Sequence, residues 1–279
     1  MPLNEIEFLQ KLMMQHTSAE TNYPNKINAA IFIDALYNWL FTPQIYNVHS
    51  TATIHETYTA LQADFLPLLQ SVLTDEATIH QQQTTFFNSI PNIYEALLQD
   101  AESVLNFDPA AISLKEVLLA YPGFYAVAIY RFAHQLQLQG VPILPRLWST
   151  HAHSKTGIDI HPAASIGQSF FIDHGTGIVI GATTVIGNNV KIYQGVTLGA
   201  INVSKAMASI KRHPTIEDDV IIYAGATILG GETVIGNNSV IGGNVWLTYS
   251  VPPYSVVYQK NEIKVRDNRP ITETFNFVI

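Results

Sequence analysis

The chain has 279 residues, of which 47% are hydrophobic, which is enough for one large domain or two ordinary ones and argues against a disordered protein. Its formal net charge of −8 argues against nucleic acid as the main partner, because phosphate binding needs a basic surface. The absence of cysteine excludes a disulfide framework and a thiolate metal site.

The N-terminal sequence MPLNEIEFLQKL contains acidic residues and no long apolar run, so it does not have the form of a signal peptide. The most apolar segment, residues 117–130, contains Pro122 and Gly123 and is too short to span a bilayer. We therefore expect a soluble, cytoplasmic protein that does not enter a membrane.

Residues 1–155 have the apolar spacing of helices, as in Ile93, Leu97, Ala101 and Val104. Four prolines interrupt this half of the chain and are expected to limit helix length; they are Pro24, Pro43, Pro67 and Pro91. The sequence from Ser113 to Glu116 has the form of a capping box and predicts a short helix that stops near Pro122 and Gly123. A further helix is predicted over 124–139, with a partly aromatic face that packs in the core, formed by Val127, Tyr130, Phe132 and Leu136.

From residue 158 onward an aliphatic side chain recurs every six positions. The series begins Ile160, Ile166, Ile172, slips by two residues between Ile178 and Ile180, and resumes after an interruption at Ile216. A fixed short period predicts a solenoid. Six residues suit a short strand and a tight turn, so three sides form a triangular coil of about eighteen residues with one aliphatic side chain pointing inward from each side.

The sequence thus predicts an N-terminal α-helical domain over 1–155, a parallel β-helix over 156–258 and a C-terminal tail over 259–279. This is an α+β fold in which the helices and the strands occupy separate segments of the chain. The pattern resembles the left-handed parallel β-helix acyltransferases. The resemblance is closest to the serine acetyltransferase family, through the motifs DPAA, DIHPAASIG, DHGTGIVIG, VTLG, RHP and GATILG over about residues 105–255. The family makes O-acetylserine from serine and acetyl-CoA, a step of cysteine biosynthesis.

Acetyl transfer to a hydroxyl requires a base that takes up the hydroxyl proton, and histidine is the side chain whose ordinary pKa lies nearest 7. The resemblance assigns that role to His174 and assigns to Asp159 the carboxylate that orients its ring. Because Asp159 precedes His174 by about one coil, we expect the two side chains to be close neighbours on adjacent coils.

The resemblance also implies a site for serine. Asp108 and Asp173 match the carboxylates that bind the substrate ammonium, although an aspartate before Pro109 is also an ordinary helix cap. Arg212 matches the arginine that pairs with the substrate carboxylate, and His213 matches a second histidine at the substrate. Acetyl-CoA is expected in a groove between two subunits that is lined by Gly199, Ala200, Ala224 and Gly225.

The phosphates of the coenzyme need cations, and the sequence does not choose among the available lysines, which are Lys205, Lys211, Lys260 and Lys264. No histidine spacing in the chain is typical of a metal site, so no metal is expected. Segment 201–211 is longer than the matching loop of many members of the family, which affects the lid of the site rather than the type of reaction.

The resemblance implies further partners. Cysteine is expected as a feedback inhibitor that competes with serine, and a site between subunits implies a homotrimer or a dimer of trimers. The tail contains Pro270 and no repeat, so we expect it to be mobile. It ends in Ile279, the type of terminus through which members of the family bind cysteine synthase.

Three alternatives remain open from the sequence. The same solenoid could acetylate a sugar or another hydroxyl compound, which would need no ammonium site. A γ-type carbonic anhydrase would need three zinc-binding histidines around an open position. A scaffold that only assembles other enzymes would show no activity with acetyl-CoA.

Overall fold

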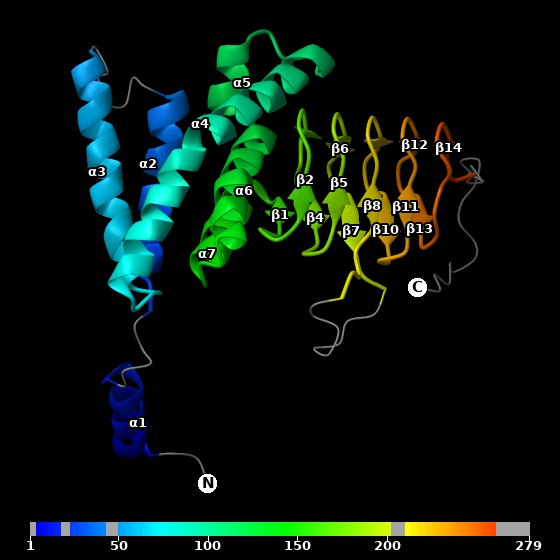
Figure 1. The fold of residues 1–279 in the computed structure, drawn as a ribbon. Helices are drawn as coiled ribbons and strands as arrows, with labels where there is room; N and C mark the ends of the chain where they lie inside the picture. The colour runs from blue at the N-terminus through cyan, green and yellow to red at the C-terminus, as the bar shows by residue number, and fades with distance from the viewer. Residues whose placement is uncertain (1–3, 18–22, 43–49, 202–209, 261–279) are drawn as a thin grey trace, which may run out of the picture.

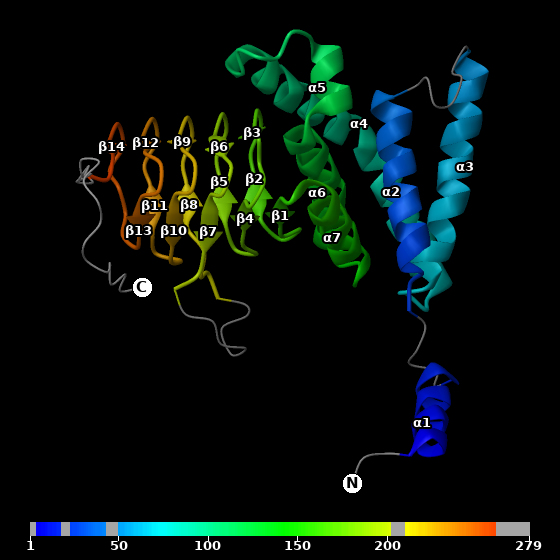
Figure 2. The same ribbon diagram turned by 180° about the vertical axis from the view of Figure 1, so that it is seen from behind.

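The computed structural model describes residues 4–17, 23–42, 50–201 and 210–260. The described part consists of a helical half followed by a solenoid of parallel strands, and the two halves lie side by side (Figure 1). Figure 2 shows the same order from behind, with α6 and α7 next to the first coil of the solenoid. The predicted order of a helical part and a parallel β-helix of short repeats is confirmed.

The helices are α1 (Glu5–Thr17), α2 (Lys26–Phe41), α3 (Thr51–Gln70), α4 (Glu76–Phe107), α5 (Leu114–Ala120), α6 (Pro122–Leu138) and α7 (Leu144–Thr156). The predicted helix start is confirmed, because the Ser113 hydroxyl accepts from the Glu116 amide at 3.2 Å; the Glu116 carboxylate accepts from the amide of Ile112 at 2.9 Å, so only one half of the capping box forms. None of the helices in these described ranges is both long enough and apolar enough to cross a membrane.

Two of the four prolines do not limit helix length, so that expectation is wrong. Pro67 lies inside α3 and Pro91 lies near the middle of α4. A proline removes one hydrogen bond from a helix, but packing of the flanking side chains stabilises the rest of the element. Around Pro91 that packing comes from Ile90 and Ile93, which are both buried.

The solenoid has three sheets. The first contains β1 (Asp159–Ile160), β4 (Val179–Ile180), β7 (Thr197–Gly199), β10 (Thr227–Leu229) and β13 (Trp246–Leu247). The second contains β2 (Ser165–Ile166), β5 (Val185–Ile186), β8 (Thr215–Ile216) and β11 (Val234–Ile235). The third contains β3 (Phe171–Asp173), β6 (Lys191–Tyr193), β9 (Ile221–Ile222), β12 (Val240–Ile241) and β14 (Val256–Val257).

The six-residue rhythm corresponds to three buried ladders. In the first sheet Ile160 pairs with Ile180, and Ile180 pairs with Leu198, all of them nearly inaccessible to solvent. Ile166 and Ile186 form the equivalent pair in the second sheet. One aliphatic side chain from each side of each coil therefore fills the interior, as the period predicts.

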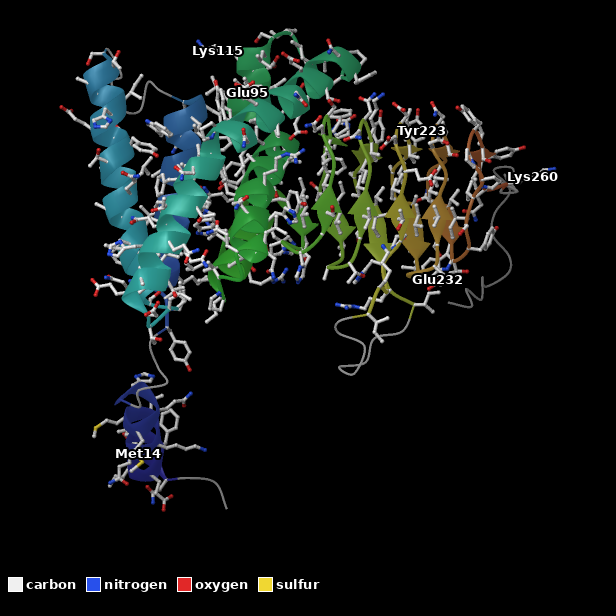
Figure 3. All side chains as sticks on the ribbon, in the orientation of Figure 1. Met14, Glu95, Lys115, Tyr223, Glu232 and Lys260 are labelled. Carbon is white, nitrogen blue, oxygen red and sulfur yellow. The ribbon has the colours of Figure 1, made fainter. Side chains whose placement is uncertain are left out.

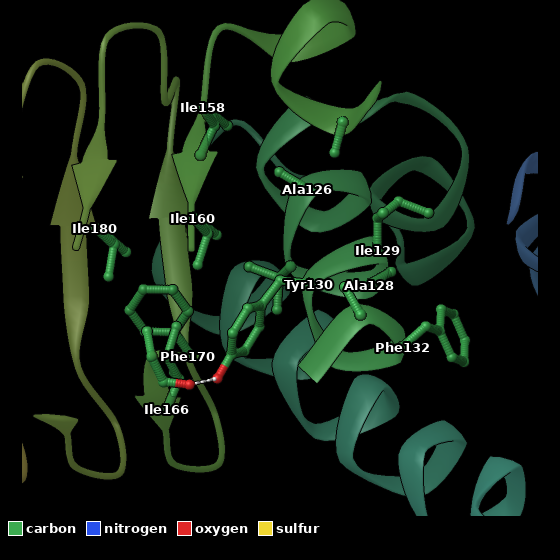
Figure 4. Close-up of a cluster of buried hydrophobic side chains, with 14 of the residues drawn as sticks. Ala126, Ala128, Ile129, Tyr130, Phe132, Ile158, Ile160, Ile166, Phe170 and Ile180 are labelled. Carbon is green, nitrogen blue, oxygen red and sulfur yellow. Dashed lines mark hydrogen bonds between the residues drawn. The ribbon is translucent and has the colours of Figure 1, made fainter. Parts of the chain in front are cut away.

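Helix α6 joins the two halves through its buried face. Figure 4 shows Tyr130 pointing from α6 toward the first coil, near Ile160 and Ile166. The Tyr130 hydroxyl donates to the carbonyl of Ala164 at 2.7 Å. The predicted core face of this helix is confirmed, since Val127, Tyr130, Phe132 and Leu136 are all at most 1% exposed.

A buried ion pair fixes the same junction. Arg131 on α6 donates to both carboxylate oxygens of Asp100 on α4, at 2.5 and 2.8 Å, and to the carbonyl of Gly167 at 2.8 Å. Asp100 also accepts from the amide of Phe170 at 2.8 Å. The end of α4 is thereby held against the turn that leads into β3, and these two elements carry Asp108 and Asp173.

Candidate active site

The candidate residues lie on two different edges of the solenoid. We call the turns from the third sheet to the first the acidic corner; its described residues are 174–178, 194–196, 223–226 and 242–245. We call the turns from the first sheet to the second the basic corner; its described residues are 161–164, 181–184, 200–201, 210–214 and 230–233. Figure 3 shows Tyr223 and Glu232, one from each corner, on opposite edges of the solenoid.

Two carboxylates come together beside the acidic corner. Asp108 caps the C-terminus of α4, and Asp173 is the last residue of β3. The Tyr121 hydroxyl donates a hydrogen bond to one oxygen of Asp108 at 2.7 Å, and the amide of Ala110 donates one to the other oxygen at 2.8 Å. Burial raises the pKa of Asp173, and so does the nearby Asp108 carboxylate, whereas His174 acts in the opposite direction. Like charges held close together in this way form a site for a cation.

His174 lies next to Asp173 on the solvent-exposed side of this pair. Its side chain is 71% exposed, and its Nε2 lies 3.7 Å from Oδ1 of Asp173. The residue has a left-handed backbone with φ of 56°, and the next residue, Gly175, has φ of 91°. The φ of 91° at Gly175 favours glycine, and a Cβ there would also lie 2.4 Å from Cδ1 of the buried Ile158. The two-residue slip in the sequence rhythm therefore produces an exposed imidazole next to two carboxylates.

The predicted placement of Asp159 and His174 on adjacent coils is wrong. Asp159 pairs with Val179, so the first coil advances the chain by 20 residues and contains both side chains. Asp159 begins that coil and His174 lies in its final turn, near the point where the next coil starts. Among the described residues no hydrogen bond or ion pair joins the two, so the orienting role of Asp159 stays a prediction.

Arg212 and His213 lie on the basic corner, where one threonine organises them. The hydroxyl oxygen of Thr183 accepts from the amides of Arg212 and His213, at 2.9 and 3.1 Å. The same oxygen lies 2.8 Å from Nδ1 of His213, which also accepts from the Thr183 amide at 3.1 Å. Lys211 reinforces the turn by donating to the carbonyls of Thr183 and Pro214.

Gly181 provides the space that the ring of His213 occupies. A Cβ on Gly181 would lie 2.0 Å from Cδ2 and 2.1 Å from Nε2 of His213. The ring is only 8% exposed. Burial lowers the pKa of His213 to about 4, and the positive charges of Arg212 and Lys211 lower it as well. His213 is therefore a neutral imidazole at physiological pH.

One chain does not bring all the predicted serine-binding residues together. Asp108, Asp173 and His174 gather at the acidic corner, whereas Arg212 and His213 lie across the first sheet at the basic corner. The predicted site residues therefore fall into two groups at opposite ends of the same short strands, which we call the acidic half-site and the basic half-site.

The residues predicted for acetyl-CoA flank the same sheet. Gly199 and Ala200 lie where β7 ends, at the basic corner, and Ala224 and Gly225 lie at the acidic corner just before β10. A side chain on Gly199 would meet Cδ2 of Leu229 at 2.8 Å.

The candidate lysines differ in their surroundings. Lys211 is held by two backbone carbonyls, and burial lowers its pKa. Lys260 is exposed at the far end of the solenoid (Figure 3). Lys205 and Lys264 lie outside the described residues, as do positions 202–209 of the predicted lid and the whole terminal segment with Ile279. Within the described ranges there is no group of three or more histidine, aspartate or glutamate side chains that could hold a metal ion.

Sequence reasoning missed three residues of these half-sites. Tyr121 and Gly181 were not among the predicted site residues. Thr183 gave no signal, because its role depends on which coil the RHP segment rejoins. The signal that could have identified Gly181 is its match in the coil register to His161, a position that carries a large side chain one coil earlier.

A three-sided parallel β-helix with an exposed histidine at one corner is the architecture of the hexapeptide-repeat acyltransferases. A family model described as "Serine acetyltransferase, N-terminal" matches residues 46–128. The chain is 54% identical over 179 residues to a plasmid serine acetyltransferase of Synechococcus elongatus, and this match covers 62% of the chain but only 56% of that relative.

Two further matches cover more of the relative. The serine acetyltransferase of Bacillus subtilis is 47% identical over 164 residues, which are 59% of this chain and 73% of that protein. The crystal structure of serine acetyltransferase isoform 3 from Entamoeba histolytica in complex with cysteine has 32% sequence identity and a TM-score of 0.75, and covers 93% of this chain and 94% of that one. The chain therefore belongs to the serine acetyltransferase family.

Proposed function

We propose that this chain transfers the acetyl group of acetyl-CoA to the hydroxyl of L-serine and so forms O-acetyl-L-serine for cysteine biosynthesis. The observation that carries this proposal is the pair of carboxylates, Asp108 and Asp173, beside the exposed imidazole of His174. An acceptor with an ammonium group next to its hydroxyl fits that arrangement, because the ammonium would neutralise the two carboxylates while the hydroxyl reaches the imidazole.

In this mechanism His174 accepts the proton of the serine hydroxyl as the oxygen attacks the thioester carbon. The new C–O bond forms, the C–S bond breaks, and His174 returns its proton to the departing thiolate of CoA. Asp159 is assigned the second task of a catalytic dyad, which is to orient the ring and stabilise its charged form. The groove for acetyl-CoA would run past Gly199, Ala200, Ala224 and Gly225.

The complete site would require a neighbouring subunit. Asp108, Asp173 and His174 of one subunit would hold the ammonium and hydroxyl, and the basic corner of the next subunit would supply Arg212 and His213 for the carboxylate. An arginine fork suits a carboxylate because it makes two parallel hydrogen bonds. A ring of three subunits repeats this head-to-tail contact three times and closes, so a homotrimer fits the arrangement; pairing of two trimers remains a prediction.

Cysteine is proposed as a competitive inhibitor, since it has the ammonium and carboxylate of serine and differs only at the side chain. The Entamoeba relative that was crystallised with cysteine supports this proposal. Binding of a cysteine synthase through Ile279 stays a prediction, because that residue lies outside the described part of the chain.

An acceptor panel tests the proposed reaction. Serine, threonine, homoserine and a simple sugar are incubated separately with acetyl-CoA, and the acetylated products are separated and quantified by chromatography. We expect O-acetylserine to dominate, because the ammonium subsite gives serine an advantage that a sugar lacks. Preferential acetylation of the sugar would replace this proposal with the alternative of a sugar acetyltransferase.

A further inference from the structure

His161 and His213 occupy equivalent places on the basic corner, one coil apart. Ile160 pairs with Ile180 in the first sheet, so the next residue of each strand matches as well, and His161 corresponds to Gly181. Gly181 has no side chain, and the ring of His213 fills the place where one would begin. The returning segment thus restores at position 181 the imidazole that the first coil carries at position 161.

Equivalent backbone amides, one coil apart, hold the two rings. The amide of Ala163 donates to Nδ1 of His161 at 3.0 Å, and the amide of Thr183 donates to Nδ1 of His213 at 3.1 Å. Ala163 and Thr183 each follow the matched positions by two residues. Because Nδ1 is an acceptor in both rings, a neutral imidazole must carry its proton on Nε2.

Both rings are neutral at physiological pH. Burial is the main cause that lowers the pKa of His161 to about 4, and the charges of Arg146 and Arg212 act in the same direction. His213 has a similarly lowered pKa, also near 4. In the part of the chain that the structure describes, no hydrogen bond is made by Nε2 of either ring. The basic corner therefore offers two fixed, uncharged N–H donors to an anion.

A carboxylate has enough acceptor positions for both of these donors. An ionised carboxylate has about four acceptor positions, of which a guanidinium occupies two. His213 would occupy a third. A second donor one coil away, at the usual strand spacing of about 4.8 Å, can converge on the same group.

We propose that His161 is a further substrate-binding residue, which donates a hydrogen bond from Nε2 to the carboxylate held by Arg212 and His213. This inference rests on the proposed serine acetyltransferase function, and it adds a residue to the basic half-site. It explains why one imidazole is built into the first coil and a second is returned to the matching place in the next coil.

Two variants separate hydrogen bonding from packing. His161→Leu removes the donor and keeps a large apolar side chain, whereas His161→Gln places an amide N–H near the position of Nε2. His153→Leu is the matched control, because His153 is an exposed histidine on α7. Each full-length protein is assayed with L-serine and with L-serinamide, in which the carboxylate is replaced by a neutral amide.

For His161→Leu we expect the KM for serine to rise about tenfold to a hundredfold, as is typical when a hydrogen bond to a charged group is lost. The kcat should change little, and the KM for serinamide should stay near that of the wild type. His161→Gln should restore most of the affinity for serine, and His153→Leu should match the wild type for both substrates. Calorimetric titration of serine without acetyl-CoA should give the same order of affinities.

Equal losses with serine and serinamide would overturn the inference, because they would indicate that His161 only supports the fold. An unchanged KM for serine in His161→Leu would overturn it as well, while leaving serine acetylation by the wild type intact. If the wild-type protein acetylates no serine at all, the proposed function fails first and the role of His161 fails with it.

Discussion

The acidic corner and the basic corner are built in different ways. The acidic half-site uses Asp173 and His174, which lie at the enlarged final turn of the 20-residue first coil, together with Asp108, which caps α4. The basic half-site depends on the long connection between β7 and β8, which returns Arg212 and His213 to a place prepared by Gly181 and Thr183. The comparison teaches that two extra residues in one turn are enough to expose the proposed base, whereas the residues proposed for the substrate carboxylate reach their place through a long connection that rejoins the repeat at a defined coil.

Replacement of the imidazole at the acidic corner should have the largest effect. His174→Ala removes the proposed general base, so kcat should fall on the order of 10²- to 10⁴-fold. Binding of acetyl-CoA, measured by calorimetry, should stay close to that of the wild type, because the coenzyme is held mainly along the groove. A variant that turns over at nearly the normal rate would remove His174 from the mechanism.

A methyl group at the basic corner should have the next largest effect. Gly181→Ala places a Cβ where the ring of His213 lies, 2.0 Å from Cδ2, and must displace that ring. We expect the KM for serine to rise about tenfold or more, since a charge-assisted hydrogen bond is lost. Gly140→Ala is a comparison for the loss of a glycine without a clash, because nothing lies within 4 Å of the added Cβ; its φ of 73° is positive, whereas that of Gly181 is not, so the control carries more backbone strain than the test variant. Identical kinetics for Gly181→Ala and the wild type would show that the position of His213 has no influence on serine binding.

Removal of a single hydroxyl tests the acidic corner more gently. Tyr121→Phe deletes the hydrogen bond to Asp108 and leaves the ring in place. The KM for serine should rise by about threefold to tenfold, which corresponds to a typical net hydrogen bond, and kcat should change less. An unaltered KM would mean that Tyr121 does not position Asp108 for serine binding.

The last prediction concerns stability and pH at the basic corner rather than catalysis. His213 has a pKa of about 4 in the folded protein and about 6.5 as a free side chain, so the unfolded state binds more protons between these values. Stability should therefore fall as the pH is lowered from about 6.5 to about 4, by at most about 1.4 kcal/mol per pH unit from this group. Urea denaturation of the wild type and of His213→Gln at pH 7 and pH 5 measures the difference. The variant should lose less stability than the wild type, and parallel losses would contradict the lowered pKa.

Sequence reasoning predicted what depends on the period and missed what depends on the register between coils. Each aliphatic side chain of the rhythm, such as Ile160 or Ile180, points inward because the six-residue unit alone sets its direction. The pairing of His213 with Gly181 could not be predicted, since the spacing does not say which coil receives the segment after a long connection. The same lack of register produced the wrong placement of Asp159 relative to His174: the first coil has 20 residues rather than about 18.

Proline was misread for a related reason. Its local preference disfavours a helix interior, but Pro91 lies in α4 between side chains that are buried against other helices. Tertiary packing decides such positions, and it is not visible in the local sequence. Residue roles that were transferred from the family motifs, by contrast, placed Asp108, Asp173 and His174 together, because those motifs carry the register with them.

The central claim is that one active site combines the acidic corner of one subunit with the basic corner of the next. It is tested most directly by co-expressing His174→Ala and Arg212→Ala chains with different tags, and by measuring serine acetylation in the purified mixed oligomers. Each variant alone should be nearly inactive, whereas random mixing of equal amounts should restore about a quarter of the wild-type sites, those that pair an intact acidic corner with an intact basic corner. Mixed oligomers no more active than the two separate variants would contradict a site shared between subunits.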